Sequence, residues 1–139
     1  MQRGASVAVF SLRDEKDIEP AFESAKRARV QALIVPGDLL VSTHQQRITG
    51  LALRQRLPTM FMFSSYVEAG GLLSYGVSVS GLFRDAARAA DRILRGARPQ
   101  DLPIEQPTKF DLAINLRTAK ELGLTIPVSL RIQATQVIE

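Results

Sequence analysis

The chain has 139 residues, of which 45% are hydrophobic and 23% charged, and it carries a net charge of +4. This length suits one domain or two very small lobes, and the composition excludes a disordered protein or a chain with a membrane span. The absence of cysteine excludes disulfides and thiolate sites, and a single histidine excludes two-histidine metal sites, so no metal or cofactor is expected.

The first half of the chain alternates short apolar runs with amphipathic segments. Strands are predicted at residues 5–12, 32–36 and 59–63, because each run is apolar and of strand length. Helices are predicted between them, one over residues 18–28 and one over residues 42–56 with Ser42 as its N-cap. This order, with nearly continuous apolar strands, predicts an α/β fold in which helices cover both faces of a parallel sheet.

The second half is less regular. Residues 64–76 mix small, polar and aromatic side chains, and no regular element is predicted for them. A helix is predicted over residues 80–95, with one apolar face and with Gly96 in the C′ position that favours glycine. Residues 97–107 hold three prolines and are predicted to be an extended connector. The last predicted elements are a strand at 110–116, a short helix at 118–122 that ends before Gly123, and one helical turn within 126–139.

Four arginines form the sharpest charge feature. Arg84, Arg88, Arg92 and Arg95 are spaced four, four and three residues apart, so they share one face of the predicted helix. Such a stripe can contact phosphates, which makes a nucleic-acid-binding domain one interpretation. The alternative interpretation is that the arginines form a solvated helix face, partly neutralised by nearby aspartates. This interpretation is favoured because no aromatic side chains interleave with the arginines.

Candidates for catalysis are few. His44 has no neighbouring ligands for a metal and is predicted to be a surface residue. Ser64 and Ser65 follow a predicted strand, but no glycine-flanked nucleophile elbow surrounds them. The Gly70-Gly71 pair lacks the spacing of a phosphate-binding loop. An enzyme is therefore the least favoured class.

Two loops fall where a parallel α/β sheet places ligands, beyond the carboxyl ends of its strands. Asp38 follows the second predicted strand and could hold an ammonium group, while Tyr66 follows the third and could pack on an apolar or aromatic group. The alternative interpretation is structural, with Asp38 capping the next helix and Glu68 acting as a first-turn acid at a helix N-terminus. The residues alone do not favour ligand binding over the structural role.

Several blocks of the sequence resemble one family. They are residues 66–76 (YVEAGGLLSYG), 93–99 (ILRGARP), 101–107 (DLPIEQP) and 114–127 (INLRTAKELGLTIP). In this order, and from about residue 7 to the end, they are similar to ABC-transporter substrate-binding proteins of the tryptophan/tyrosine-uptake type. The resemblance implies the C-terminal portion of a type I periplasmic-binding-protein-like fold. In that fold two lobes clamp a small amino-acid-like or aromatic molecule, and the closed form docks on a membrane permease.

The resemblance also implies an organisation and a site. Residues 1–63 would form most of the C-terminal lobe, residues 64–107 would cross to the first lobe, and residues 108–139 would return across the hinge. Asp38 would be the main ligand contact, and Ser64, Ser65, Tyr66 and Glu68 would belong to the same cleft. Gly70, Gly71 and Gly76 would serve backbone geometry at the crossover.

A half-clamp cannot enclose a ligand, and the apolar face of the predicted 80–95 helix has no sheet of its own to cover. We therefore expect a homodimer in which the helix of residues 77–96 is exchanged between copies. A stand-alone, self-associating sensor or interaction module is the alternative function. The resemblance implies a periplasmic location. The opening MQRGASVAVF lacks the features of a signal peptide, so a natural short product would be cytoplasmic.

Overall fold

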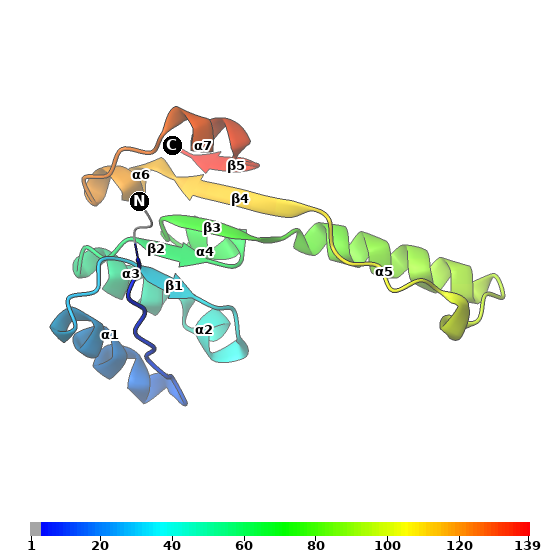
Figure 1. Ribbon diagram of the computed structural model, residues 1–139, viewed down its shortest axis with the longest axis horizontal. Helices are drawn as coiled ribbons and strands as arrows, with labels where there is room; N and C mark the ends of the chain where they lie inside the picture. Colours follow the sequence, from blue (N-terminus) through cyan, green and yellow to red (C-terminus); the bar gives the residue numbers. More distant parts are fainter. Residues whose placement is uncertain (1–3) are drawn as a thin grey trace.

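The computed structural model describes residues 4–139, and its framework is a five-stranded sheet (Figure 1). The strands lie in the order β1 (Leu33–Val35), β2 (Thr59–Phe61), β3 (Leu73–Val77), β4 (Phe110–Asn115) and β5 (Gln136–Ile138). Neighbouring strands are parallel except for β3 and β4, which are antiparallel. The predicted α/β class is confirmed, and the sheet is mixed because the chain leaves β3 and returns in the opposite direction in β4.

Short helices fill most of the connections. They are α1 (Ile18–Arg27), α2 (Leu39–Thr43), α3 (Gln45–Arg54), α4 (Ser64–Glu68), α6 (Leu116–Glu121) and α7 (Val128–Gln133), with 3-10 turns η1 (Glu15–Asp17) and η2 (Pro99–Asp101). The predicted helix of residues 42–56 is two helices that meet at His44. The predicted N-cap is also wrong, because Asp38 rather than Ser42 caps the first of them.

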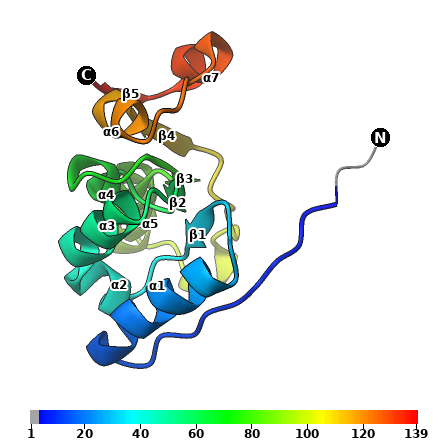
Figure 2. The ribbon, with the colours of Figure 1, turned by 90° about the vertical axis from the view of Figure 1, so that its left-hand side faces the viewer.

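One face of the sheet carries the hydrophobic core. Side chains of α1, α2, α3 and α4 pack there, and Figure 2 shows α2, α3 and α4 gathered on one side of the strands. The buried members of the core are Ile18, Phe22, Val41, Ile48, Leu51, Ala52, Leu57, Phe61 and Tyr66. Leu33 and Val35 of β1 pack against the same cluster. The core therefore fixes the positions of the loops that leave β1 and β2.

The opposite face of the sheet is apolar, and much of it is open. The strand register places Ile34 beside Met60 and Met60 beside Leu73, so these three side chains form one row. We call the following set the open face: Ile34, Met60, Leu73, Tyr75, Val77, Phe110 and Leu112. Ile34 is 73% exposed and Tyr75 is 53% exposed. The prediction that helices cover both faces is therefore wrong for this part of the sheet.

The predicted strand at residues 5–12 does not join the sheet. The segment has no strand structure, and Val7 and Val9 are each 84% exposed. Figure 2 shows it leading away from the rest of the molecule. A strand needs a hydrogen-bonding edge, and this segment does not pair with the edge of β1 that β2 leaves free. Leu12, at its end, packs against the core.

Three elements lie where the sequence predicted no strand or helix. Helix α4 and most of strand β3 fall within residues 64–76, and β5 falls near the end of the chain. Helix α7 corresponds to the helical turn that was predicted within residues 126–139. Strand β3 contains Gly76, whose close approach to Met62 after β2 leaves no room for a side chain. The glycine interrupts the apolar pattern by which a strand is predicted from sequence.

The long helix α5 (Val79–Leu94) projects from the sheet (Figure 1). We call residues 79–109, which comprise α5 and its return connector, the arm, and residues 13–78 with 110–139 the body. A single residue, Ser78, joins β3 to α5, and its N–H donates to the carbonyl of Lys109 at 2.9 Å. Gly96 has φ of +103°, which confirms the predicted glycine C′ position. The two chain crossings between body and arm are thus hydrogen-bonded to each other.

Candidate functional site

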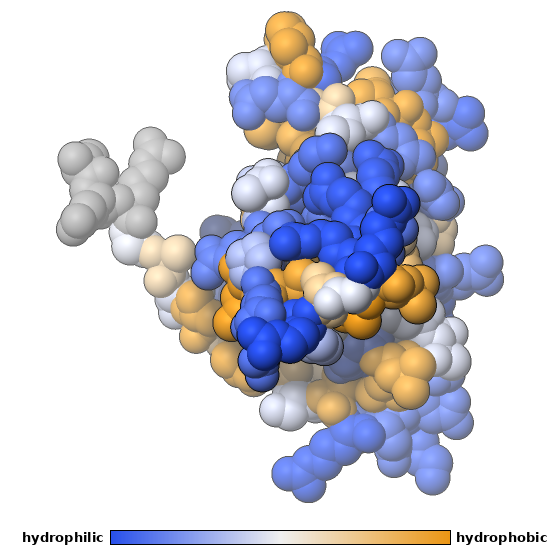
Figure 3. Space-filling model, turned by 90° about the vertical axis from the view of Figure 1, so that its right-hand side faces the viewer, coloured by the Kyte–Doolittle hydropathy of each residue, from blue (hydrophilic) through white to orange (hydrophobic). Residues whose placement is uncertain are grey.

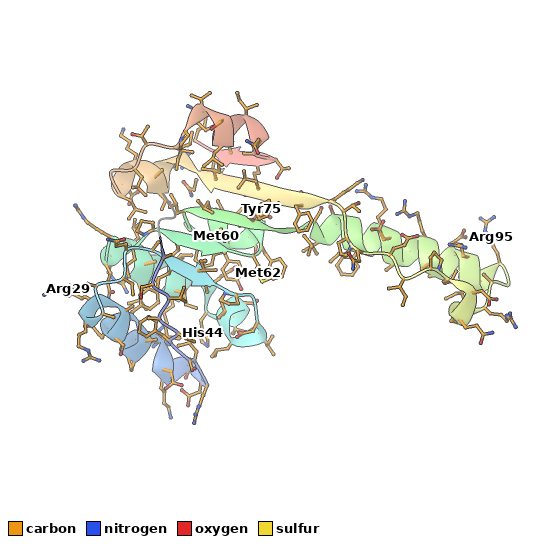
Figure 4. The ribbon with its side chains drawn as sticks, in the orientation of Figure 1. Arg29, His44, Met60, Met62, Tyr75 and Arg95 are labelled. Atoms are coloured by element: carbon orange, nitrogen blue, oxygen red, sulfur yellow. The ribbon has the colours of Figure 1, made fainter. Side chains whose placement is uncertain are left out.

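Two loops meet at the edge where the parallel strands β1 and β2 end (Figure 4). The backbone N–H of Gly37, after β1, donates to Sδ of Met62, after β2, at 3.2 Å. A Cβ atom on Gly37 would lie 2.5 Å from Cε2 of Phe63, so a side chain here would force the ring of Phe63 to move. The two loops therefore form one continuous edge, which carries Asp38 from one side and Ser64 from the other.

Asp38 is the N-cap of α2. Its side-chain Oδ1 accepts a hydrogen bond from the N–H of Val41 at 2.7 Å, and its backbone is extended. Its side chain lies at the exposed edge. The structural interpretation of Asp38 as a helix cap is confirmed, and this role leaves the residue at the exposed edge beyond β1. Its ligand contact stays a prediction.

Tyr66 lies inside the core. It is 1% exposed, and its ring stacks on that of Phe61 with centroids 4.9 Å apart and planes 8° apart. Its hydroxyl shares a hydrogen bond of 2.9 Å with Oγ of Ser42. The ring of Tyr66 therefore packs on Phe61 rather than facing the edge, and its hydroxyl is linked to α2 by the hydrogen bond to Ser42. The signal that could have shown this link is the spacing of Ser42, one helical turn after Asp38.

The other predicted residues lie on α4 and separate along it. Ser64 is half-buried and Ser65 exposed, and both are in the first turn beside the edge. Glu68 is the last residue of α4, so its expected place as a first-turn acid is wrong. One helical turn separates it from the serines, and its Oε1 accepts from Nε2 of Gln136 at 3.2 Å. Ser64 and Ser65 thus join Asp38 at the edge, while Glu68 faces β5.

The turn after α4 is held by polar side chains that the sequence did not single out. Oγ1 of Thr49 donates to the carbonyl of Ala69 at 3.0 Å, and Oγ1 of Thr118 donates to that of Gly70 at 2.9 Å. Nδ2 of Asn115 donates to the carbonyl of Val67 at 3.2 Å. All three donors are buried, so they fix the backbone of this turn.

The glycines of this region confirm the backbone role that was expected of them. Gly70 has φ of +102°, a conformation that favours glycine. A Cβ on Gly71 would lie 2.8 Å from the carbonyl oxygen of Tyr66, and one on Gly76 would lie 2.1 Å from that of Met62. These close approaches bring β3 and the turn against the loop that follows β2.

The arginine stripe is partly neutralised. Arg88 pairs with Asp85, and Nε of Arg95 lies 2.9 Å from a carboxylate oxygen of Asp91. His44, predicted to lie at the surface, is half-buried, with Nε2 3.6 Å from a carboxylate oxygen of Glu15. Within residues 4–139 no cluster of histidine, aspartate and glutamate could hold a metal ion. No helix of this part of the chain is long and apolar enough to cross a membrane.

An exposed ion pair joins α1 to α3. Arg47 donates to Glu19 through Nε at 2.8 Å, and this hydrogen bond holds the pKa of Glu19 below its ordinary value. The pKa of Asp17 is also lowered, because its carboxylate accepts from the backbone N–H groups of Arg13 and Asp14. The ion pair of Glu19 with Arg47 therefore links α1 to α3, whereas Asp17 stabilises the turn that precedes α1.

The family of the chain follows from comparison with known proteins. The family model for the ABC transporter substrate binding protein matches residues 1–138. No curated protein matches the chain in sequence. A structure described as the ABC domain in complex with L-Trp, from Streptococcus pneumonia, is similar over 97% of this chain, with 27% identity and a TM-score of 0.83.

Two further structures show the same fold. A conserved domain protein from Vibrio cholerae O1 is similar over 89% of this chain, with 25% identity and a TM-score of 0.77. A substrate-binding protein with adhesive properties from Clostridium difficile, in its ligand-free open form, is similar over 88%, with 24% identity and a TM-score of 0.66. This chain spans only 42%, 46% and 41% of the Vibrio, Streptococcus and Clostridium chains respectively. The chain belongs to the family of ABC transporter substrate-binding proteins.

Proposed function

We propose that this chain is the C-terminal part of an ABC-transporter solute-binding protein, and that it binds a small amino-acid-like or aromatic solute without catalysing a reaction. The observation that carries the proposal is the similarity, over nearly the whole chain, to a structure that holds L-Trp. The edge formed by the loops after β1 and β2 supports it, because ligands of α/β folds bind beyond the carboxyl ends of parallel strands.

The proposed contacts differ among the five predicted residues. Asp38 supplies a carboxylate for an ammonium group, and the hydroxyls of Ser64 and Ser65 supply neighbouring polar contacts. Tyr66 acts indirectly, since its hydroxyl holds Ser42 and its ring is buried. Glu68 is the weakest candidate because it lies one turn away and contacts Gln136. The remaining contacts would come from a second lobe.

The proposed organisation follows that of a two-lobed clamp. Residues 1–63, the first three of which lie outside the described structure, belong to the C-terminal lobe. Residues 64–107 cross toward a first lobe, and residues 108–139 return from it. The protein would then act in the periplasm, and its partners would be the membrane permease of an ABC transporter and, for this chain alone, a second copy of itself. The exposed side chains of the arm also favour the alternative function, a self-associating sensor or interaction module.

The test is ligand-induced thermal stabilisation with a matched pair of variants. We expect L-Trp, L-Tyr or L-Phe to raise the melting temperature of the chain, because a ligand that binds the folded state stabilises it. Asp38→Asn keeps the helix cap but removes the charge, and should weaken ligand binding about 10- to 100-fold, the usual worth of a charge-assisted hydrogen bond. Asp14→Asn, at the cap of η1, is the control and should bind like the unmodified chain.

Two results would contradict the proposal. The first is that none of L-Trp, L-Tyr, L-Phe, glycine and the charged amino acids shifts the melting temperature at millimolar concentration. The chain would then not bind such a solute by itself. If L-Trp stabilises the unmodified chain and Asp38→Asn equally, the solute does not use Asp38. A steep salt dependence of binding to DNA or RNA would instead favour the arginine stripe as the functional surface.

A further inference from the structure

The arm carries an apolar stripe that no other element of residues 4–139 covers fully. Val79, Leu82, Phe83, Ala86, Ala90, Ile93 and Leu94 recur at helical spacing along α5. Phe83 is 74% exposed and Leu94 is 87% exposed. Figure 3, which faces the end of the molecule that bears the arm, shows hydrophobic residues beside hydrophilic ones there.

The return connector lies on the other side of the helix. It forms a shallow groove with Gly81, Arg84, Asp85 and Arg88 of α5, and contributes Glu105, Gln106, Thr108 and Lys109. At 100° per residue these four α5 positions lie opposite the apolar stripe. Gly81 is the buried residue of α5. The connector therefore covers the polar side of the helix and leaves the apolar side free for another surface.

The open face of the sheet is a matching surface. It is apolar along each strand that contributes to it, and Tyr75 and Phe110 stack there with centroids 5.6 Å apart. Phe110 is 47% exposed and Ile34 is 73% exposed. The spacing of about 4.8 Å between strands gives the face a width of about 14 Å from β1 to β4. A 16-residue helix is about 24 Å long, so α5 can cross the whole face.

The arm cannot reach the open face of its own chain. One residue, Ser78, separates β3 from α5, and its hydrogen bond to Lys109 keeps the two crossings together. Residues Val77 and Phe110 are paired in the sheet immediately before this point. The arm therefore continues the direction in which β3 leaves the body (Figure 1), and folding back would require this pairing to break.

The chain exposes more surface than a compact monomer of its mass. Its solvent-accessible surface is 10191 Å². A compact monomer of 15.3 kDa exposes about 7100 Å² by the usual scaling with mass. The excess of about 3000 Å² exceeds the roughly 1000–2500 Å² that each subunit buries in an obligate dimer. A second copy supplies both of the surfaces that are needed, an apolar helix and an open apolar sheet.

We propose that two copies associate about a twofold axis, with the apolar stripe of each α5 seated on the open face of the other copy. This deepens the proposed self-association and rests on it, but it does not depend on the solute. The arrangement is reciprocal, so each copy fills its partner's open face and has its own filled. The connector side of the arm, with its arginines, faces solvent in the dimer.

The first test is the oligomeric state measured by light scattering at tens of micromolar. The unmodified chain should have twice the mass of 15.3 kDa. Phe83→Asp on the arm and Tyr75→Asp on the open face should each raise the dimer dissociation constant at least about 30-fold, as for a buried interface aromatic. Arg92→Asp, which changes the charge more but lies on the connector side of α5, should leave the dimer intact.

The second test identifies the surface that α5 contacts in the dimer. The chain has no cysteine, so introduced ones react alone. A chain with Ala86→Cys mixed with a chain with Met60→Cys should give a heterodimer band with a short bis-maleimide crosslinker. A chain with Arg92→Cys should not crosslink to the Met60→Cys chain. A monomer at tens of micromolar would overturn the self-association. A dimer that lacks the Ala86–Met60 crosslink, or that gives an equal Arg92–Met60 crosslink, would overturn only the contact of α5 with the open face.

Discussion

Phe61 in the body is 1% exposed and stacks on Tyr66, whereas Phe83 in the arm is 74% exposed. The same side chain thus has opposite environments in the two regions. In the body, helices and sheet close around one core; in the arm, α5 is amphipathic and its apolar side faces no other element of the described chain. The difference shows that the sequence of the arm encodes a contact that the body of its own chain does not provide.

The largest expected effect contrasts these two phenylalanines directly. Phe61→Ala should lower the free energy of unfolding by about 3–5 kcal/mol, because it leaves a cavity in the core. Phe83→Ala should change it by less than about 0.5 kcal/mol at protein concentrations below the dimer dissociation constant. Urea denaturation monitored by circular dichroism measures both. Equal losses from the two variants in dilute solution would show that the arm packs on its own body.

A second contrast uses two glycines. Gly76→Ala would bring a Cβ within 2.1 Å of the backbone oxygen of Met62, so we expect a loss of about 3 kcal/mol or more, since backbone must move. Gly96→Ala meets open space and suffers only from its positive φ, which should cost about 1–2 kcal/mol. The same denaturation experiment ranks them. A larger loss at Gly96 would contradict the close packing of β3 against the loop after β2.

A smaller effect concerns the cap at the candidate site. Asp38→Ala should lower the free energy of unfolding by about 1 kcal/mol, because the N–H of Val41 loses its acceptor. Asp38→Asn should retain nearly all of the stability. Comparing the pair separates the structural role of Asp38 from its proposed ligand contact. Equal stability of all three proteins would show that the side chain of Asp38 does not stabilise α2.

The smallest effect is a pH dependence of the body alone. The folded-state pKa of Glu19 is lowered from its ordinary value of 4.5 by Arg47. The stabilisation by this pair is therefore present above about pH 4.5 and lost as pH falls through the lower folded pKa. The melting temperature of Glu19→Gln should be slightly below that of the unmodified chain at pH 6, and the gap should close in acid. A gap that widens in acid would reverse the assigned sign.

The sequence predicted the parts of the fold that local patterns determine. The apolar runs of β1 and β2 and the long amphipathic α5 with Gly96 at its end all appear as expected. Residues 5–12 have the composition of a strand, yet a strand forms only against a free edge, and an edge is a property of the whole fold. Strand β5 begins at a polar residue, Gln136, and lacks the longer apolar run that revealed β1 and β2.

The candidate site was predictable only in outline. The position of Asp38 and Ser64 at one edge follows from two parallel strands that end side by side. The orientation of Tyr66 does not follow, because it depends on where α4 begins: with a first residue at Ser64, the third residue of the helix turns its ring onto Phe61. The placement of Glu68 depends on the same helix boundary.

The hydrogen bond between Ser78 and Lys109 makes the arm a modular insertion. Strands β3 and β4 are antiparallel neighbours, and the chain leaves and re-enters the sheet at one point. In topological terms the two strands are a β-hairpin whose loop has been replaced by a helix and its return. A two-residue Asn-Gly turn placed between Ser78 and Lys109 would restore the plain hairpin. The arm can therefore be removed without interrupting the pairing of β3 with β4, so its proposed contribution to assembly can be altered without changing the edge that carries Asp38.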